Sequence, residues 1–275
     1  MHSIFDIEYF IGESVWTRRV RQRITSIAKY SVSTLIIGQS GTGKQFLARS
    51  IHQHSDRRHQ PFVPLRCASI PASFFAAQLL GHEKGAFPGA MGSSLGCLKA
   101  AGDGTVLLED VDQLSWESQT CLVEALQSRR IRPVGSSTTV PLNARIIATA
   151  SSDLEDAVQG GRFRQDLYDL LAAVTVETAA LVDRTEDVEP LVDHFLAKIC
   201  LEAGLPWKTL SPSAMAMIQS YAWPENLDGL QAALERAVCA CEDDVIGPEH
   251  FAEFVLPEWN DTAAPWQSHL DSFEW

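Results

Sequence analysis

The sequence predicts an α/β domain with a central parallel sheet, followed by a small all-α domain. Up to about residue 178, short apolar runs alternate with longer segments of helical periodicity, which is the pattern of a parallel sheet with crossover helices. From residue 179 to about 256 only helical periodicity remains. With 275 residues, of which 45% are hydrophobic, the chain can bury one substantial core and a smaller second one.

The first elements follow one another closely along the chain. Apolar positions at helical spacing predict a helix from about residue 14 to 30. Thr34 to Ile37 is a short apolar run that Gly38 stops, so we expect a buried strand there. A helix from Gly43 to about His54 and a strand from Phe62 to Leu65 come next.

The second half of the expected sheet begins with a strand from Thr105 to Leu108, which Gly104 and an acidic pair enclose. Further helices and strands alternate after it: a helix near 112–128, a strand from Ala144 to Ala148, a helix near 161–172 and a strand from Ala173 to Val176. We therefore expect the α/β domain to cover residues 1–178.

The second domain is expected over residues 179–256. Its helical segments lie near 186–203, 211–221, 226–241 and 248–254. Residues 257–275 mix acidic side chains with four aromatic ones and have no periodicity: Trp259, Trp266, Phe273 and Trp275. We interpret this stretch as a flexible tail that is able to dock a partner.

The composition excludes several classes of protein. A net charge of −13 argues against a broad DNA-binding face, because neutralising phosphates needs clustered lysines and arginines. The six cysteines contain no CxxC pair, which disfavours zinc sites and disulfide frameworks. His52 and His54 would point to different faces of their helix and are interpreted as solvated. No segment resembles a signal peptide or a membrane span, so we expect a cytoplasmic protein.

A glycine-rich loop between the first expected strand and the next helix has the residues of a phosphate-binding loop: Gly38, Gln39, Ser40, Gly41, Thr42, Gly43 and Lys44. In this setting backbone N–H groups cradle phosphates and the lysine reaches the terminal ones. Gln45 follows, where the general motif has a Ser or Thr hydroxyl for Mg²⁺. We expect ATP and Mg²⁺ as cofactors; the alternative is a glycine-rich turn that only packs.

An acidic pair, Glu109 and Asp110, follows the strand from Thr105 to Leu108. Carboxylates at such a strand end hold the metal and activate the attacking water of nucleotide-hydrolysing sites. The alternative is a pair of solvated side chains, which are common at strand ends. The position of Lys44 upstream favours the catalytic interpretation.

The segment between these two motifs resembles a known family. Gly81-His82-Glu83-Lys84-Gly85-Ala86-Phe87-Pro88-Gly89-Ala90 closely resembles the GAFTGA loop of NtrC-type sigma-54-dependent transcription activators. Further segments from residue 10 to 255 resemble the same family: Gly12-Glu13-Ser14, Pro61-Phe62-Val63, Cys67-Ala68, Gly161-Arg162-Phe163-Arg164, Asp166-Leu167-Tyr168 and Trp223-Pro224 with Asn226.

The resemblance implies a P-loop AAA+ domain with a helical lid, assembled as a hexameric ring of this chain or of related subunits. The loop near residues 81–92 would touch sigma-54 RNA polymerase holoenzyme through Gly85, Ala86, Phe87, Pro88, Gly89 and Ala90. The receiver and helix-turn-helix domains that often flank this module do not occur in the sequence. We therefore expect a stand-alone central domain without its own DNA-binding domain.

The hydrolysis machinery departs from the family pattern. In the family, a metal-holding Asp is followed by a water-activating Glu. Glu109 and Asp110 stand at these two positions here, so the order of the two acids is reversed. Arg66 replaces an Asn that positions the catalytic Glu, and is expected either to pair with Asp110 or to lie exposed after its strand. Arg164 matches the first arginine finger, which acts on the neighbouring subunit's nucleotide; the alternative is a surface ion pair with Asp166. The second finger falls on Leu170.

Three more departures affect nucleotide sensing and the loop from Gly85 to Ala90, which we call the partner loop. Asp228 replaces the sensing arginine of the lid, and Ser151 replaces the Asn that ends a core strand. At the loop tip Pro88 replaces a Thr, which removes a hydroxyl and a backbone N–H donor.

Three hypotheses follow. The chain is a working ATPase motor, a nucleotide-binding subunit that no longer hydrolyses and joins active relatives, or a structural remnant whose surface serves other contacts. An intact phosphate loop disfavours the third, and the choice between the first two stays open.

Overall fold

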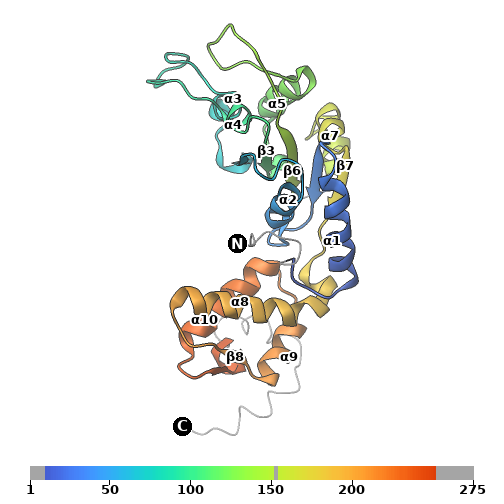
Figure 1. The fold of residues 1–275 in the computed structure, drawn as a ribbon, viewed down its shortest axis with the longest axis vertical. Coiled ribbons are helices and arrows are strands. Elements are labelled where there is room, and N and C mark those ends of the chain that lie inside the picture. Colours follow the sequence, from blue (N-terminus) through green and yellow to red (C-terminus); the bar gives the residue numbers. More distant parts are fainter. Residues whose placement is uncertain (1–9, 152–153, 252–275) are drawn as a thin grey trace. The chain divides into compact units, whose positions relative to one another are not determined.

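The computed structural model describes residues 10–151 and 154–251, and its contacts divide the chain into two units. The first unit comprises residue 10 and residues 15–180, and the second comprises residues 11–14 and the chain from residue 181 (Figure 1). The aromatic tail expected over residues 257–275 lies outside the described residues. Within the described ranges, no helix combines the length and the apolar character that crossing a bilayer requires.

The first unit is built on a five-stranded parallel sheet, which confirms the predicted fold class. The strands are β1 (Thr34–Ile37), β2 (Phe62–Arg66), β3 (Thr105–Glu109), β6 (Arg145–Ala150) and β7 (Val174–Glu177). They lie in the order β2-β3-β6-β1-β7, and each neighbouring pair runs parallel. β1 lies inside the sheet, between β6 and β7, and the loop that follows it opens at the sheet's carboxyl edge.

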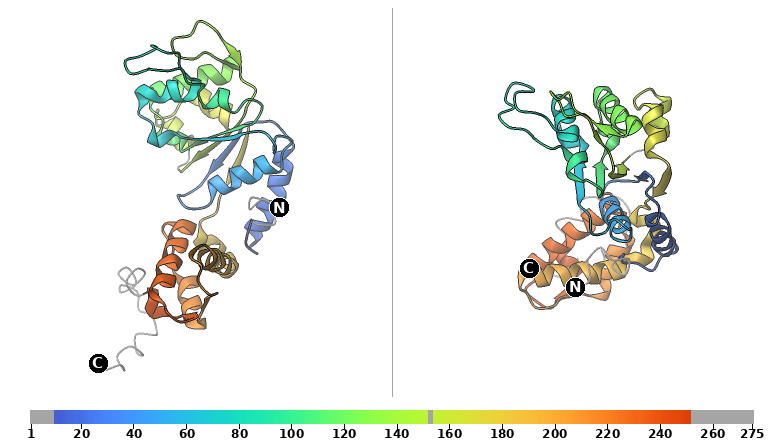
Figure 2. Two further views of the ribbon diagram at one scale, coloured as in Figure 1. Left: turned by 60° about the vertical axis from the view of Figure 1, so that its left-hand side comes forward. Right: turned by 45° about the horizontal axis from the view of Figure 1, so that its top comes forward.

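Helices cover both faces of this sheet (Figure 2). On one face α1 (Val15–Ala28) and α2 (Lys44–Gln53) pack with Ile36, Leu107 and Ile147. On the other face are α3 (Ala72–Leu80), α4 (Cys97–Ala100), α5 (Trp116–Ser128), α6 (Leu154–Gln159) and α7 (Gln165–Leu171), which pack with Leu35, Leu108 and Ile146. Neighbouring residues of one strand thus enter different cores, as side-chain alternation requires.

Two parts of the first unit differ from the sequence prediction. Helices α3, α4 and α6 were not predicted, and the two-residue strands β4 (Arg130–Ile131) and β5 (Val140–Pro141) form a small antiparallel pair beyond α5. His52 is buried rather than solvated, because it faces the sheet, where its Nδ1 lies 2.9 Å from Thr105 Oγ1.

The second unit is the predicted helical lid, with α8 (Val188–Ala203), α9 (Pro212–Ser220) and α10 (Asn226–Ala240) around one apolar core. It also contains one short parallel pair, β8 (Thr209–Leu210) and β9 (Val245–Ile246). The helix expected near 248–254 is a 3-10 turn, Pro248–Phe251, within the described residues. Ser211 begins α9 as a side-chain cap, accepting the N–H of Ala214.

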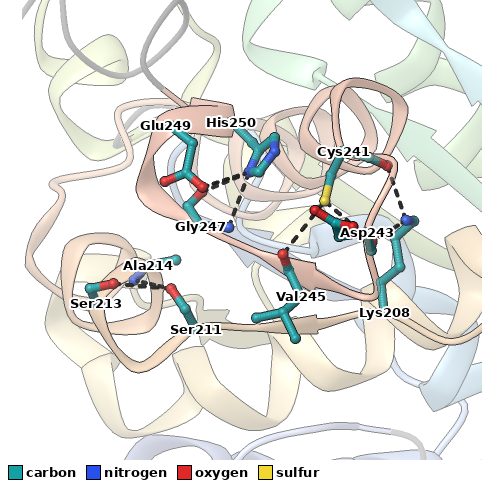
Figure 3. A network of polar contacts seen from close by, with 10 residues as sticks. All are labelled: Lys208, Ser211, Ser213, Ala214, Cys241, Asp243, Val245, Gly247, Glu249 and His250. Carbon is teal, nitrogen blue, oxygen red and sulfur yellow. Dashed lines mark hydrogen bonds and ion pairs between the residues drawn. The ribbon is translucent and has the colours of Figure 1, made fainter. Parts of the chain in front are cut away.

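A polar network closes the end of this lid (Figure 3). The Lys208 side chain is only 3% exposed, and its ammonium donates to the carbonyl of Cys241, at 3.0 Å, and to that of Asp243. These carbonyls follow the last turn of α10, where a cation offsets the negative end of the helix dipole.

Residues 11–14 belong to the lid unit because Asp187 binds them. Its carboxylate accepts the backbone N–H groups of Glu13 and Ser14 at 2.6 and 2.7 Å and the Ser14 hydroxyl at 2.9 Å. A Cβ on Gly12 would lie 2.4 Å from the same carboxylate, so only glycine fits this approach. Sequence analysis had placed these residues in the first domain.

Candidate functional site

The glycine-rich loop connects β1 to α2 at the carboxyl edge of the sheet. Gly43 has a φ of 94° immediately before Lys44, the first residue of α2, and Gly41 has a φ of 72°. Left-handed backbone of this kind favours glycine. A Cβ on Gly38 would lie 1.9 Å from Thr178 Oγ1, so this position also requires glycine. The loop therefore directs the first N–H groups of α2 toward one place, as a phosphate site needs.

The side chains of this loop hold it in a compact turn. Lys44 Nζ donates to the carbonyls of Gly38, at 2.7 Å, and Gln39, at 3.0 Å. The Thr42 hydroxyl donates to the Gln39 carbonyl at 2.8 Å and lies 2.7 Å from Thr178 Oγ1. Lys44 is thus placed within the loop, and phosphate oxygens would replace these carbonyls as its acceptors.

Glu109 ends β3 beside the start of α2, with 9% of its surface exposed. Gln45 Nε2 donates to its Oε1 at 3.1 Å, and Arg66 Nε lies 3.7 Å from its Oε2. Arg66 therefore contacts Glu109 rather than Asp110, and its side chain is 66% exposed, as its alternative interpretation expects. In the parallel register of β2 and β3, Arg66 is the direct partner of Glu109, and the next residue turns away from the strand.

Asp110 occupies that turn in a left-handed conformation, with φ 56° and ψ 51°. Its backbone N–H donates to the Thr149 hydroxyl of β6 at 3.2 Å. Asp residues tolerate this conformation better than most, so the turn costs little strain. The two acids of the reversed pair thus differ in backbone conformation: Glu109 is the last residue of the strand, and Asp110 is in the turn that follows.

Asp112 lies at the same edge of the sheet, in the turn after β3, although the sequence did not predict a role for it. The Ser151 hydroxyl donates to its Oδ2 at 2.7 Å, and the Ser151 N–H to its Oδ1 at 3.2 Å. Its position two residues beyond the acidic pair was the available signal, since β3 and β6 are neighbours and their ends meet. No group of three metal-ligating side chains gathers in the described ranges 10–151 and 154–251.

Arg164 lies at the start of α7 and makes the ion pair that was its alternative interpretation. Its Nε and Nη2 donate to the two carboxylate oxygens of Asp166 at 2.9 and 2.7 Å. Its Nη1 donates to the Thr120 hydroxyl at 3.0 Å, and the guanidinium carbon lies 5.6 Å from the centre of the Trp116 ring. The hydrogen bond from Arg164 lowers the pKa of Asp166. Leu170 packs against the core of the first unit.

The loop Gly85–Ala90 lies between α3 and α4. Two backbone bonds close it, from Gly85 to the Ala90 carbonyl at 2.9 Å and from Ala90 to the Phe87 carbonyl at 3.0 Å. The Phe87 ring is half-buried, 4.9 Å from His82 and 5.9 Å from Phe74, while Pro88 and Gly89 are exposed. Phe74 was not predicted to contribute, because the helix α3 that carries it was not predicted.

The base of the loop is fixed from two sides. His82 and Ser94 exchange backbone hydrogen bonds at 3.0 and 2.8 Å, and Glu83 donates to the Val134 carbonyl at 3.0 Å. In the lid, Asp228 is exposed in the first turn of α10.

Two family models of known proteins match this chain. A family model described as the sigma-54 interaction domain matches residues 10–177, and one described as the AAA+ ATPase lid domain matches residues 182–266. The Nif-specific regulatory protein of Azotobacter vinelandii is 38% identical over 236 residues, which are 86% of this chain and 45% of that protein. The response regulator protein PilR of Pseudomonas aeruginosa is 35% identical over 264 residues, covering 96% and 59%.

A solved structure agrees with the fold. NtrX from Brucella abortus in complex with ATP has a TM-score of 0.84 and 29% identity, covering 96% of this chain and 59% of that chain. The chain spans about half the length of the curated relatives it matches.

Proposed function

This chain belongs to the family of sigma-54 interaction domains, and from that premise we propose that it is an ATP-binding transcription regulator that contacts sigma-54 RNA polymerase through the loop Gly85–Ala90. Its relatives carry regulatory names; transcriptional regulatory protein ZraR of Klebsiella oxytoca, for example, is 38% identical over 247 residues. The proposal is limited to this domain and to its contact with sigma-54 RNA polymerase.

The phosphate loop is the observation that carries the nucleotide part of the proposal. Gly38, Gly41 and Gly43 have backbone positions that suit glycine, and Lys44 opens α2 within reach of the same loop. A turn that only packs has no need of a lysine at the start of the helix that follows it. A related structure of 29% identity was solved with ATP, which supports the same ligand here.

The partner loop offers a small, exposed and mostly apolar tip. Pro88 and Gly89 are exposed, and Met91 beyond them is 89% exposed. Pro88 cannot donate a backbone hydrogen bond, so recognition at the tip would use apolar contact and backbone carbonyls. Phe87 packs against His82 and Phe74, and would act as the base that holds the tip in place.

Assembly and location complete the proposal. By family resemblance the chain would form a ring of six subunits. In such a ring Arg164 would lie beside the nucleotide of the neighbouring subunit, and it would leave its ion pair with Asp166 to bind a phosphate. Such a ring would work in the cytoplasm.

A second candidate is a subunit that binds nucleotide without hydrolysing it and assembles with active relatives. The contacts of Glu109 favour it. Gln45 and Arg66 each approach one of its carboxylate oxygens, and the reversed order leaves the shorter Asp110 at the position expected to activate water.

Nucleotide titration and steady-state hydrolysis on the purified chain test both candidates, with Lys44→Ala as the disabling variant and Lys99→Ala, an exposed lysine of α4, as the matched control. Binding and turnover that both depend on Lys44 would support the motor. Lys44-dependent binding without turnover would support the regulatory subunit. If neither is detected, the nucleotide proposal is wrong.

A further inference from the structure

The residues around Glu109 do not fit the Mg²⁺ that the family resemblance implies. Mg²⁺ takes six oxygen ligands in near-ideal octahedral geometry, and in nucleotide sites it uses carboxylates, hydroxyls and waters. The two side chains that contact the Glu109 carboxylate, Gln45 and Arg66, both present nitrogen donors to it.

Gln45 stands where a hydroxyl would bind the metal. Its terminal group lies 3.1 Å from Glu109 Oε1, and a group that faces a carboxylate oxygen must present its NH₂, because two acceptors would repel each other. In this arrangement Gln45 binds the carboxylate and offers no oxygen to a cation at the same place.

Arg66 adds a permanent positive charge to the same carboxylate. It is the cross-strand partner of Glu109, and its guanidinium lies beside the carboxylate. The side chain is 66% exposed, so the ion pair itself adds little stability. A divalent cation at Glu109 would nevertheless meet a like charge and would have to displace two donors.

We infer that this chain binds a nucleoside triphosphate without a metal ion at Glu109, and equally well with or without Mg²⁺ in solution, with Arg66 and Lys44 supplying positive charge for its phosphates and Gln45 and Arg66 occupying the carboxylate of Glu109. The inference rests on the proposed nucleotide binding and adds that this binding does not depend on Mg²⁺. It also gives a reason for weak hydrolysis, since the charge that a metal contributes in phosphoryl transfer would be missing.

The test is an equilibrium titration of the full chain with N-methylanthraniloyl-ATP, once in excess Mg²⁺ and once in EDTA. We expect the two dissociation constants to agree within about threefold, a difference well below the tenfold step that marks a distinct interaction. Binding that tightens by more than about tenfold with Mg²⁺ would overturn the inference. No binding in either buffer would remove the proposed nucleotide function itself, so the two failures are distinguishable.

The double variant Gln45→Thr/Arg66→Asn restores the residue types that the family motifs have at these two positions. We expect its binding in EDTA to weaken by about tenfold or more and to recover when Mg²⁺ is added. Arg58→Asn, which removes one exposed arginine elsewhere, should leave both constants unchanged. Circular dichroism verifies folding. A folded double variant that still ignores Mg²⁺ would refute the role given to Gln45 and Arg66.

Discussion

Exchanging the two acids of the reversed pair, in the variant Glu109→Asp/Asp110→Glu, is expected to increase ATP hydrolysis. Shortening residue 109 by one methylene withdraws its carboxylate by roughly 1.5 Å. The 3.1 Å hydrogen bond from Gln45 would then be broken, and the ion pair with Arg66, already at 3.7 Å, would be too long to persist. At position 110 the longer side chain moves its oxygens outward by a similar distance.

The size of the gain follows from geometry. A misplacement of about 1 Å at a catalytic group costs about a hundredfold in rate. Because Arg66 and Leu170 still depart from the family pattern, we expect a gain of about tenfold to a hundredfold.

Steady-state phosphate release, measured at saturating ATP with Mg²⁺, is the assay. The two single variants report each position separately, and Lys44→Ala in the exchanged background shows whether turnover belongs to this site. Suppose the exchanged variant folds, binds ATP and still shows no gain over the starting chain. The order of the acids would then not limit hydrolysis, and the reasoning would be refuted.

Two further predictions concern stability. Lys208→Met should lower the free energy of unfolding of the lid by about 3 kcal/mol, because it strands the carbonyls of Cys241 and Asp243. Urea unfolding measures this against the exposed Lys198→Met, and a loss below about 1 kcal/mol would contradict it. Burial lowers the pKa of His52 from 6.5, so the unfolded chain takes up this proton more readily than the folded chain. Stability should therefore fall as pH decreases below about 6.5, and less so in His52→Gln; parallel melting curves for the two chains would contradict this.

The order of strand, loop and helix around the phosphate loop was predictable because its signals are local. Apolar runs mark β1 and β3, glycines mark the turn, and the lysine follows at once. The helix α3 was not predicted because it lacks such a local signal. Its sequence, ASFFAAQLL, is apolar nearly all round and shows no polar face to mark a helix.

The lid shows a second kind of limit. Its helices were predicted from periodicity, but strands β8 and β9 are two residues long and leave no pattern. Residues 11–14 join this unit through the Asp187 carboxylate, a contact between positions 173 and 174 residues apart. Separations of that length leave no trace in a local pattern.

Local sequence patterns predicted the fold class, the phosphate loop, the loop Gly85–Ala90 and the positions that depart from the family motifs, because each is a property of residue types at short spacing. The tertiary structure decided which of those residues meet. The parallel register of β2 and β3 sets Arg66 beside Glu109 instead of Asp110, and the adjacency of β3 and β6 brings Ser151 to Asp112. These contacts depend on strand pairing across the sheet, where a shift of a single residue would give every side chain a different partner.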